Sequence, residues 1–457
     1  MKYVFFTTDF YPFPIAKHLQ GEGNDVTIAL INHMTDLRVP EIDDEEKPAD
    51  RKERMSTFDG MIDKKSLKEA MEMLSRVKDK DRADYFIFFD FNNMFHIAED
   101  CLKMGFTNGL FPTEYYYKME REREMARDFV KENYTKLKVA ESHDFQTVDE
   151  GIDFLLENDG IFVLKSNGNC GKTVVPKTED EDVAREQVIE TLHENRKDYE
   201  EGGFLLEQKI QNALEVTPVL VCYDGVPIYS VAEFENKEYG AGNIGSQKGG
   251  NQVLSVRTEL NCKLNKIAFP QAVLELAAQQ PGMSIFDAGL LWNGTHFYFT
   301  EFCAMRFGWD GVFSEMVMGD NGKPFVGYYF EQIVKGKSPI RKDYGVSVRL
   351  FNYEGDLEDT TDPQGGEVIT WDKSIENNLF LYGVKMEKNK VVDTAHRDFI
   401  AVVTGADNDM EKAVKSCYDR IGKFHFEKLY FRPCFDFLSK DYRNSIPNRL
   451  SAIKRFL

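Results

Sequence analysis

Short apolar runs alternate with helical segments over the first 112 residues, and this alternation restricts the fold more than any other feature. Strands that alternate with helices form a parallel sheet covered on both faces. We therefore expect an α/β domain over residues 1–112, with a short last strand at 107–111 and the charged stretch 41–83 as an insertion carrying one amphipathic helix. The three clearest strand-like runs are KYVFFTT (2–8), DVTIALIN (25–32) and DYFIFFD (84–90).

The pattern changes in the second half of the chain. A charged helix is expected at 115–134, and strands and helices alternate to about residue 200. From residue 203 the chain reads as antiparallel strands joined by Asp-Gly and Asn-Gly turns. The stretch GAGNIGSQKGG (240–250) holds five glycines, too many for a regular element, so we expect an irregular loop there. A last block of strands and one helix follows at about 341–433.

Composition narrows the class of protein. The formal net charge of −20 argues against a duplex nucleic-acid reader, which needs clustered Lys and Arg. No apolar run is long enough to span a bilayer, and the N-terminal run, soon followed by Asp and Pro, does not fit a cleavable signal. The seven cysteines are scattered without a CxxC pair, which fits a reducing compartment and no structural zinc. We expect a cytoplasmic protein without membrane contact.

The loop FVLKSNGNCGKTV (162–174) resembles a phosphate-binding P-loop that has lost two residues. A true P-loop needs four residues between its first Gly and Gly-Lys-Ser/Thr, and a helix must follow. Here the spacing is short and the next residues read as a strand. We interpret the loop as a glycine-rich hairpin that places Lys165 and Lys172 beside nucleotide phosphates. A surface loop with two solvated lysines is the alternative.

A second candidate is the hairpin FDAGLLWNGTHFYFTEFCAMRFG (286–308). Asp287 and Glu301 offer two carboxylates for Mg²⁺, and Arg306 could meet a transferred phosphate. A strict two-residue turn would pair Asp287 with Thr300 and direct the two carboxylates to different faces. A three-residue loop or a bulge would place them on one face. The alternative is an exposed hairpin with unrelated charges.

The glycine-rich stretch 240–250 is the third candidate. Ordering so many glycines is entropically costly, so an ordered version would normally be held by a ligand. Its backbone amides, with Asn243 and Lys248, could bind a carboxylate or a phosphate. A mobile linker is the alternative.

Taken in order, these stretches resemble the ATP-grasp ligase family, and specifically glycinamide ribonucleotide synthetase (phosphoribosylamine–glycine ligase). The resemblance runs over most of the chain, and the glycine-rich loop is its most specific part. FVLKSNGNCGKTVV is similar to the family's VVKADGLAAGKGVVV, ENKEYGAGNIGSQKGG to HKRVGDGDTGPNTGG, and the hairpin at 286–308 to YAGLM…VLEFNxRFGDPE.

The resemblance implies a fold and a domain order. It implies a Rossmann-like pre-ATP-grasp domain at 1–112, then an ATP-grasp domain of α+β type at 113–335 with a lid subdomain at about 113–200. A small α+β domain at 336–440 and a basic terminal tail or helix at 441–457 would complete the chain.

The resemblance also implies roles for single residues, with ATP and Mg²⁺ as cofactors. Mg²⁺ would be held by Glu301, with Asp287 as a possible substitute for a family Asn that this chain lacks. Arg306 would meet the γ-phosphate or the acylphosphate, and Lys172 would belong to the lid over the ATP phosphates. Asn243 and Lys248, from the glycine-rich stretch, complete the catalytic candidates. Glu207 and Glu215 lie where the family's hinge and ribose contacts fall. The residues implied in ATP binding are Arg123, Lys165, Gly168, Gly171, Lys172, Glu207 and Glu215.

The amine-acceptor end departs from the family. Where the family has a GGREHA loop, this chain has DFYPFP (9–14), with no Gly and no Arg to hold a sugar phosphate. We expect an enzyme, monomeric or homodimeric, that activates a glycine-like carboxylate as an acylphosphate and transfers it to an amine. Two alternatives stay open: a sister ligase for another nucleotide, a nucleobase or a peptide amine, and a non-catalytic nucleotide-binding descendant.

Overall fold

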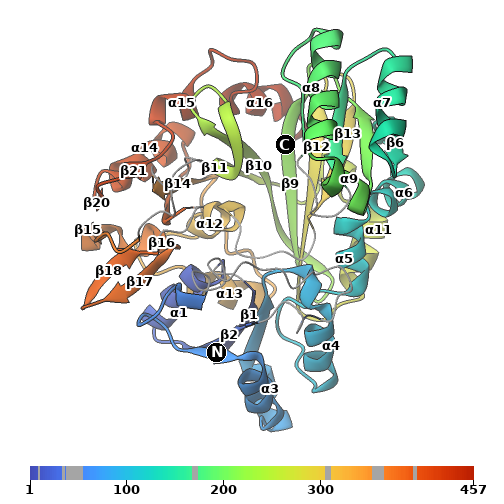
Figure 1. Ribbon diagram of the computed structural model, residues 1–457. Helices are drawn as coiled ribbons and strands as arrows, with labels where there is room; N and C mark the ends of the chain where they lie inside the picture. The colour runs from blue at the N-terminus through green and yellow to red at the C-terminus, as the bar shows by residue number, and fades with distance from the viewer. Residues whose placement is uncertain are drawn as a thin grey trace. The chain divides into compact units, whose positions relative to one another are not determined.

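The computed structural model describes residues 1–8, 11–32, 37, 55–166, 173–303, 310–352, 365–394 and 399–457 (Figure 1). By its internal contacts the chain divides into two compact units. Unit 1 comprises Met1–Tyr116, Val216–Asp287 and Ala304–Leu457, and unit 2 comprises Tyr117–Glu215 and Ala288–Cys303. The expected boundaries at residues 112, 335 and 440 are finer than this division and stay predictions.

Unit 1 begins with the expected parallel sheet. Four strands pair in the order β3-β2-β1-β4, every pair parallel. Aromatic side chains on adjacent strands stack, with ring centroids 4.7 Å apart for Phe5 and Phe88 and 5.0 Å apart for Phe6 and Phe89. The elements are β1 (Lys2–Thr7), α1 (Phe13–Gly21), β2 (Asp25–Leu30), β3 (Lys64–Ser66), α3 (Leu67–Ser75), β4 (Tyr85–Phe89) and α4 (Phe95–Lys103).

Part of the expected insertion belongs to this sheet. Strand β3 pairs with β2 from Ile28↔Lys64 to Leu30↔Ser66. Helix α3 follows at once, because Ser66 and Glu69 form a reciprocal capping box at its first turn. Residues 41–54 of the expected insertion lie outside the described residues. The strand expected at 107–111 is present only as isolated bridges, Ile87↔Gly109 and Leu110↔Met283.

A larger antiparallel sheet follows in unit 1, and its strands pair in the order β16-β19-β14-β11-β10-β9. Strands β14 and β19, from the C-terminal block, therefore extend the same sheet as the central hairpin β10–β11. Helix α12 contacts β11 and β14, and α14 contacts β19. The bounds are β9 (Leu214–Tyr223), β10 (Val226–Gly240), β11 (Ile244–Thr258), α12 (Asp310–Val317), β14 (Tyr344–Asn352), β16 (Leu379–Leu381), β19 (Ala401–Asp407) and α14 (Met410–Ile421).

The glycine-rich stretch 240–250 forms a hairpin rather than the expected irregular loop, so that expectation is wrong. Strand β10 runs to Gly240, and β11 begins at Ile244. Two register shifts, between Asn236 and Glu238 and between Glu238 and Gly240, allow the pairing to continue to the turn. The glycines here supply backbone angles for the turn and the bulges without ending the ladder.

Unit 2 contains a small antiparallel sheet in the order β6-β8-β7, packed against helices α7, α8 and α9 (Figure 1). Strand β13 pairs with β12 on one side and with β5, in parallel, on the other. The bounds are β5 (Leu137–Val139), β6 (Ser142–Phe145), α7 (Val148–Glu157), β7 (Phe162–Ser166), α8 (Glu181–Glu194), α9 (Arg196–Gly202), β8 (Phe204–Gln208), β12 (Met283–Trp292) and β13 (Phe297–Phe302).

The charged helix expected at 115–134 is broken in two. Helix α5 (Glu114–Arg121) ends before Glu122, whose ψ of 87° is not helical, and α6 (Arg123–Asn133) begins after it. Arg123 therefore lies at a helix start rather than in the middle of a long helix.

The other α-helices and β-strands of the described residues lie in unit 1. They are α10 (Lys263–Ala268), α11 (Gln271–Ala278), α13 (Val326–Val334), β15 (Thr370–Trp371), β17 (Val384–Glu387), β18 (Lys390–Asp393), β20 (Phe424–His425), β21 (Leu429–Tyr430), α15 (Cys434–Leu438) and α16 (Ile446–Ile453). Within the described ranges, every helix is too short or too polar to cross a membrane.

Candidate functional site

Lys165 and Glu207 form a buried ion pair on two adjacent strands of unit 2. Lys165 pairs with Leu205 and Val163 with Glu207, so the two charged side chains are diagonal neighbours on one face of β7 and β8. The Lys165 ammonium donates to Glu207 Oε1 at 2.6 Å, and the side chains are only 11% and 9% exposed. Because a charge buried alone is costly, each side chain needs the other in this position.

Arg123 approaches the same end of β7. Its Nε donates to the carbonyl of Ser166 at 3.3 Å, and its Nη1 lies 3.8 Å from Glu301 Oε2. The Glu301 side chain is half exposed, so this long ion pair contributes little to stability and leaves the carboxylate open to solvent. The structure therefore forms two ion pairs from side chains singled out from the sequence, Lys165 with Glu207 and Arg123 with Glu301. Arg123 connects them along the chain, through the backbone of Ser166 next to Lys165.

The chain reverses after β7, as the hairpin interpretation requires. Leu164 and Val174 exchange both backbone hydrogen bonds, at 3.0 and 2.8 Å, in an antiparallel bridge. The next helix, α8, begins only at Glu181, whereas a P-loop would run directly into a helix. Lys165 is at the end of the outgoing strand, as predicted. Gly168, Gly171 and Lys172 lie outside the described residues.

The hairpin β12–β13 carries a bulge that affects the predicted metal ligands. Its loop is longer than a two-residue turn, because Trp292 pairs with Phe297, and the register shifts between Gly289 and Leu290. Beyond the shift Gly289 pairs with Glu301, and Ala288 with Phe302. The longer loop and the bulge are the two features that the one-face arrangement was expected to need. The convergence of Asp287 and Glu301 stays a prediction.

The oxygen chemistry of these carboxylates suits Mg²⁺, which prefers a few carboxylates together with water and phosphate oxygens. Their role as ligands stays a prediction. Among the described residues no three His, Cys, Asp or Glu side chains gather as a metal site. Arg306 lies outside the described residues.

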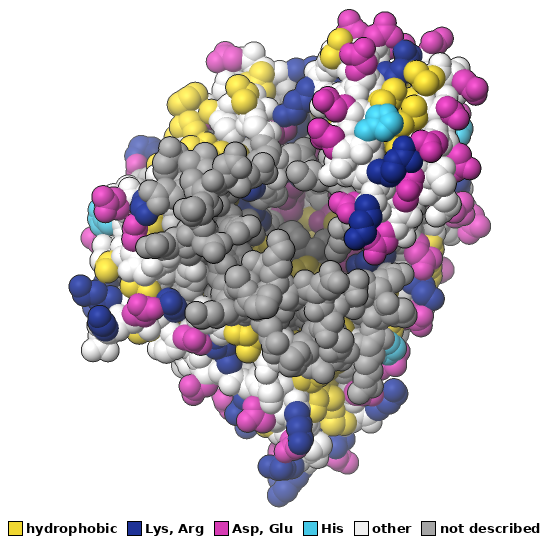
Figure 2. Space-filling view, viewed as in Figure 1, with side chains coloured by type: hydrophobic (Ala, Val, Ile, Leu, Met, Phe, Trp, Pro, Cys, Tyr) yellow, Lys and Arg dark blue, Asp and Glu magenta, His cyan; other side chains and the backbone are white. Residues whose placement is uncertain are grey.

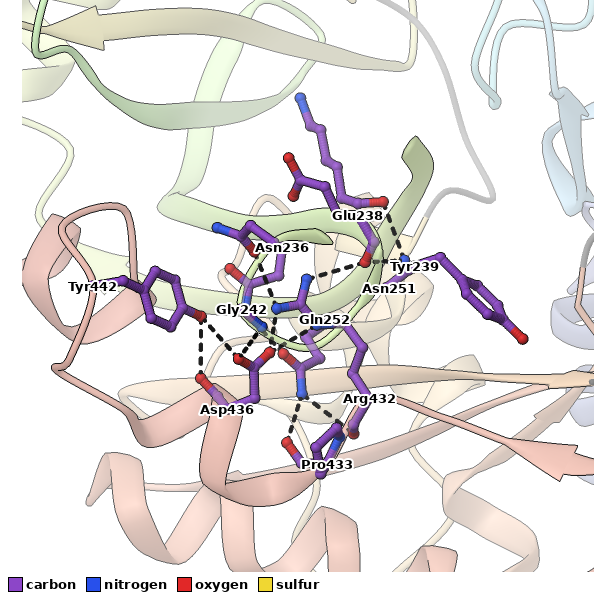
Figure 3. A network of polar contacts seen from close by, with 12 residues as sticks. Asn236, Glu238, Tyr239, Gly242, Asn251, Gln252, Arg432, Pro433, Asp436 and Tyr442 are labelled. Atoms are coloured by element: carbon purple, nitrogen blue, oxygen red, sulfur yellow. Dashed lines mark hydrogen bonds and ion pairs between the residues drawn. The ribbon is translucent and has the colours of Figure 1, made fainter. Parts of the chain in front are cut away.

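The turn of the glycine-rich hairpin is engaged with its own chain. Asn243 has a φ of 60°, a left-handed conformation that Asn tolerates better than most residues. Its Oδ1 accepts a hydrogen bond from Arg432 at 3.0 Å. The neighbouring Gly242 amide donates to Asp436 at 2.8 Å (Figure 3). The Lys248 carbonyl accepts from Arg349. These contacts give Asn243 a structural role; the substrate contacts predicted for Asn243 and Lys248 stay predictions.

Glu215 is half-buried on β9, where alternate side chains point inward. Its predicted contact with ribose stays a prediction.

A buried pair of carboxyl groups in unit 1 was not anticipated from the sequence. Glu233 on β10 and Glu315 on α12 are hydrogen-bonded to each other, and each is nearly inaccessible to solvent. Ser255 donates to Glu233 at 2.7 Å, and the Tyr229 hydroxyl, itself 2.6 Å from the hydroxyl of Tyr329, donates to Glu315. The available signal was Glu233 itself, a charged residue in the apolar run YSVAEF.

Burial determines the charge state of this pair. Desolvation raises the pKa of Glu315 to about 7. Desolvation, followed by the charge of Glu315, raises the pKa of Glu233 well above its ordinary range. Since two like charges in contact cannot both be buried, the pair holds at least one proton at neutral pH.

Comparison with known proteins gives a fold. No family model and no curated protein matches the sequence. Among solved structures, phosphoribosylamine–glycine ligase from Thermotoga maritima is similar over 94% of this chain and 99% of its own, with a TM-score of 0.65 and 16% identity. An ADP complex of N5-carboxyaminoimidazole ribonucleotide synthetase is similar over 92% and 96%, with a TM-score of 0.53 and 13% identity.

A third solved structure extends the comparison. The biotin carboxylase domain of 2-oxoglutarate carboxylase from Hydrogenobacter thermophilus, solved with MgADP and bicarbonate, covers 100% of this chain and 98% of its own. Its TM-score is 0.57 and its identity 14%. At such low identity these similarities establish the fold, which is the mixed α/β fold of ATP-grasp enzymes that the sequence resemblance predicted.

Proposed function

We propose that the protein is an ATP-dependent carboxylate–amine ligase that activates a glycine-like carboxylate and transfers it to an amine, as phosphoribosylamine–glycine ligase does. The observation that carries the proposal is the group formed by Arg123, Lys165, Glu207 and Glu301, gathered within one unit of an ATP-grasp fold. Two cationic and two anionic side chains on β7, β8, β13 and α6 of this unit match the needs of a nucleotide with its metal ion.

Each of these residues has a role in the proposal. Lys165 binds ATP phosphates, and its ion pair with Glu207 holds the ammonium in place before the nucleotide arrives. Arg123 contacts phosphate from the start of α6, where backbone amides also favour anions. Glu301, with Asp287, would hold Mg²⁺, which neutralises phosphate charge when bound. Gly168, Gly171 and Lys172 would form the lid, and Glu215 would contact the ribose.

The chemistry requires no side-chain nucleophile. A carboxylate oxygen of the substrate attacks the γ-phosphorus of ATP, the bond to ADP breaks, and an acylphosphate forms. The amine then attacks the acyl carbon, a C–N bond forms, and inorganic phosphate leaves while the amine loses a proton. The protein contributes position and charge, with Arg306 on the transferred phosphate and Asn243 and Lys248 near the substrate carboxylate.

A second candidate function is a sister ligase that uses a different amine. The observation that favours it lies at the carboxyl edge of the parallel sheet, where Thr7 donates to the buried carboxyl of Asp90 at 2.5 Å. Ligands of open α/β sheets bind at this edge. A carboxyl group and the DFYPFP sequence suit an uncharged or cationic acceptor better than a sugar phosphate dianion.

One experiment tests the function and separates the two candidates. Phosphate release from MgATP is measured with a panel of amino acids and amines that includes glycine with phosphoribosylamine. We expect Lys165→Met and Glu301→Gln to lower the rate at least 100-fold, and Lys131→Met, a surface lysine paired with Asp128, to leave it unchanged. Best stimulation by phosphoribosylamine would exclude the sister ligase. Full activity of both site variants would show that the site is wrongly assigned.

A further inference from the structure

The turn between β10 and β11 is ordered although its sequence favours disorder. Gly242, Asn243 and Gly245 have φ values of 70°, 60° and 92°, and Gly240 pairs with Ile244 across the turn. Glycine loses more conformational freedom on folding than any other residue, so this turn needs strong contacts to stay in one conformation. The sequence suggested that a ligand supplies them.

Side chains from the C-terminal part of unit 1 supply these contacts instead. The Tyr430 hydroxyl donates to the carbonyl of Tyr239 at 2.8 Å, and the two rings stack with centroids 4.3 Å apart. Arg449, on α16, donates to the carbonyl of Glu235 at 2.7 Å and to the Asn236 side chain at 3.0 Å. Both contacts hold backbone or side-chain groups of β10 just before the turn.

Arg432 and Asp436 hold the turn itself (Figure 3). The Arg432 guanidinium donates to the Glu238 carbonyl and to Asn243 Oδ1, each at 3.0 Å, and to Asp436 Oδ2 through Nε at 2.8 Å. The other oxygen of Asp436 accepts from the Gly242 amide at 2.8 Å. Arg432 is 0% exposed and Asp436 2%, so the pair is inside the protein and cannot touch a substrate. One buried ion pair thus connects both sides of the turn.

The ion pair is in turn attached to strand β11. Gln252 Nε2 donates to the hydroxyl of Tyr418 at 2.6 Å and to the carbonyls of Arg432 and Pro433 at 3.3 and 3.1 Å. Gln252 Oε1 accepts from Asn236 on the opposite strand at 2.8 Å. Because the same side chain joins both strands to the segment after β21, the turn and the ion pair form one connected network (Figure 3).

We infer that Arg432 and Asp436 are positioning residues that hold the β10–β11 turn in its working conformation before any ligand binds. This inference rests on the proposed function, in which the hairpin lies near the substrate carboxylate. A turn ordered in advance spares substrate binding the entropic cost of ordering five glycines. Loss of the pair would therefore weaken use of the carboxylate and leave ATP binding unchanged, since the proposed ATP residues lie in unit 2.

The test uses two independent changes. Asn243→Gly removes the contact with Arg432 and keeps the left-handed backbone unstrained. Asn389→Gly makes the same change at another turn residue, whose φ is 63°, and is the matched control. The combined change Arg432→Met with Asp436→Leu removes both buried charges together, so that neither is left unpaired. Asn243→Asp keeps an oxygen acceptor for Arg432, so its amide hydrogen exchange in the turn should match that of the wild type.

The first readout is amide hydrogen exchange of the ligand-free full chain. We expect exchange at residues 239–248 to rise at least tenfold in Asn243→Gly and in the double variant, and to stay unchanged in Asn389→Gly. Unchanged exchange in the turn of both altered proteins would overturn the inference. If the double variant does not fold, the exchange rates of Asn243→Gly alone decide whether the inference holds. This readout needs no turnover, so it gives an answer even if the proposed function fails.

The second readout is kinetic, with MgATP and glycine as probes and the most active amine of the panel. We expect the double variant to lower kcat/KM for glycine at least tenfold and to change KM for ATP less than twofold. Faster exchange with an unchanged kcat/KM for glycine would refute the positioning role. No ATP turnover by the wild type with any substrate would instead refute the proposed function, while the exchange result would still show whether the pair orders the turn.

Discussion

Each unit buries a pair of ionisable side chains. The two pairs avoid an unpaired buried charge in different ways. In unit 2 the Lys165 ammonium neutralises the Glu207 carboxylate at 2.6 Å. In unit 1 two carboxyl groups, Glu233 and Glu315, face each other and share their site with hydroxyl groups. The Lys165–Glu207 pair is stabilised by opposite charges, and the Glu233–Glu315 pair is stabilised by a bound proton. The first is consequently sensitive to the loss of a partner, and the second to pH.

The largest expected effect comes from breaking the opposite-charge pair. Lys165→Met leaves the Glu207 carboxylate buried without its counter-ion, which should lower the free energy of unfolding by about 3–5 kcal/mol. Denaturant unfolding at pH 7 measures the change. Lys165→Met combined with Glu207→Leu removes both charges and should recover most of the loss. A stability loss in the double variant equal to that in the single variant would contradict a counter-ion role for Lys165.

The second effect is the pH dependence of the carboxyl pair. The pKa of Glu315 is raised by burial to about 7, so the folded protein binds a proton that the unfolded chain releases near its ordinary value of 4.5. The stabilisation of the folded state by this proton is complete below pH 4.5, and it is lost as the pH rises through about 7. The contribution of Glu315 to the free energy of unfolding should fall by roughly 3 kcal/mol over this window. Glu233, whose pKa is also raised, adds to this fall.

Denaturant unfolding from pH 4.5 to 8 measures this dependence. Glu315→Gln keeps a hydrogen-bonding side chain that cannot ionise, and should make the profile shallower in the window. The remaining slope comes from Glu233, whose pKa burial also raises. Glu331→Gln, on the exposed surface of α13, is the matched control and should keep the wild-type profile. An unchanged profile in Glu315→Gln would show that the pair does not share a proton.

A third effect tests how closely Glu233 is packed. A Cβ atom at Gly311 would lie 2.3 Å from Glu233 Oε2, which is closer than any van der Waals contact. Gly311→Ala should therefore displace the carboxyl and lower the free energy of unfolding by about 1–3 kcal/mol. Gly422→Ala, at a position where a Cβ has its nearest neighbour at 3.7 Å, is the control. Equal stability of the two variants would mean that Glu233 can move freely.

The smallest effect on stability is expected at Arg123. Its 3.8 Å ion pair with the half-exposed Glu301 should contribute about 0–1 kcal/mol, so Arg123→Gln should unfold almost as the wild type does. Its phosphate release, by contrast, should fall about tenfold or more if Arg123 contacts ATP, because a charge-assisted hydrogen bond contributes roughly 1.5–3 kcal/mol. Wild-type turnover in this variant would remove Arg123 from the proposed ATP site.

Much of the fold could be predicted from local patterns. Alternating strands and helices predicted the parallel sheet of unit 1, and the short spacing in GNCGKT with a following strand excluded a P-loop. The order of motifs predicted the ATP-grasp fold that the structural similarities support. Two local expectations were wrong: a single helix at 115–134, which breaks at Glu122, and an irregular loop at 240–250.

Three features that local patterns could not predict involve residues whose partners are distant in the sequence. Glycine content indicated that the turn at 240–245 is costly to order, but the sequence could not indicate that Arg432 and Asp436 order it. The bulge beside Gly289, which shifts the register of β12 against β13, depends on how two strands pair. The proton held by Glu233 and Glu315 depends on β10 and α12 packing together. Periodicity and turn chemistry act between neighbours in the chain, so local patterns predicted most helices and strands and pointed to the candidate cations. Burial and strand pairing set charge and register, and they arise only when distant segments pack together.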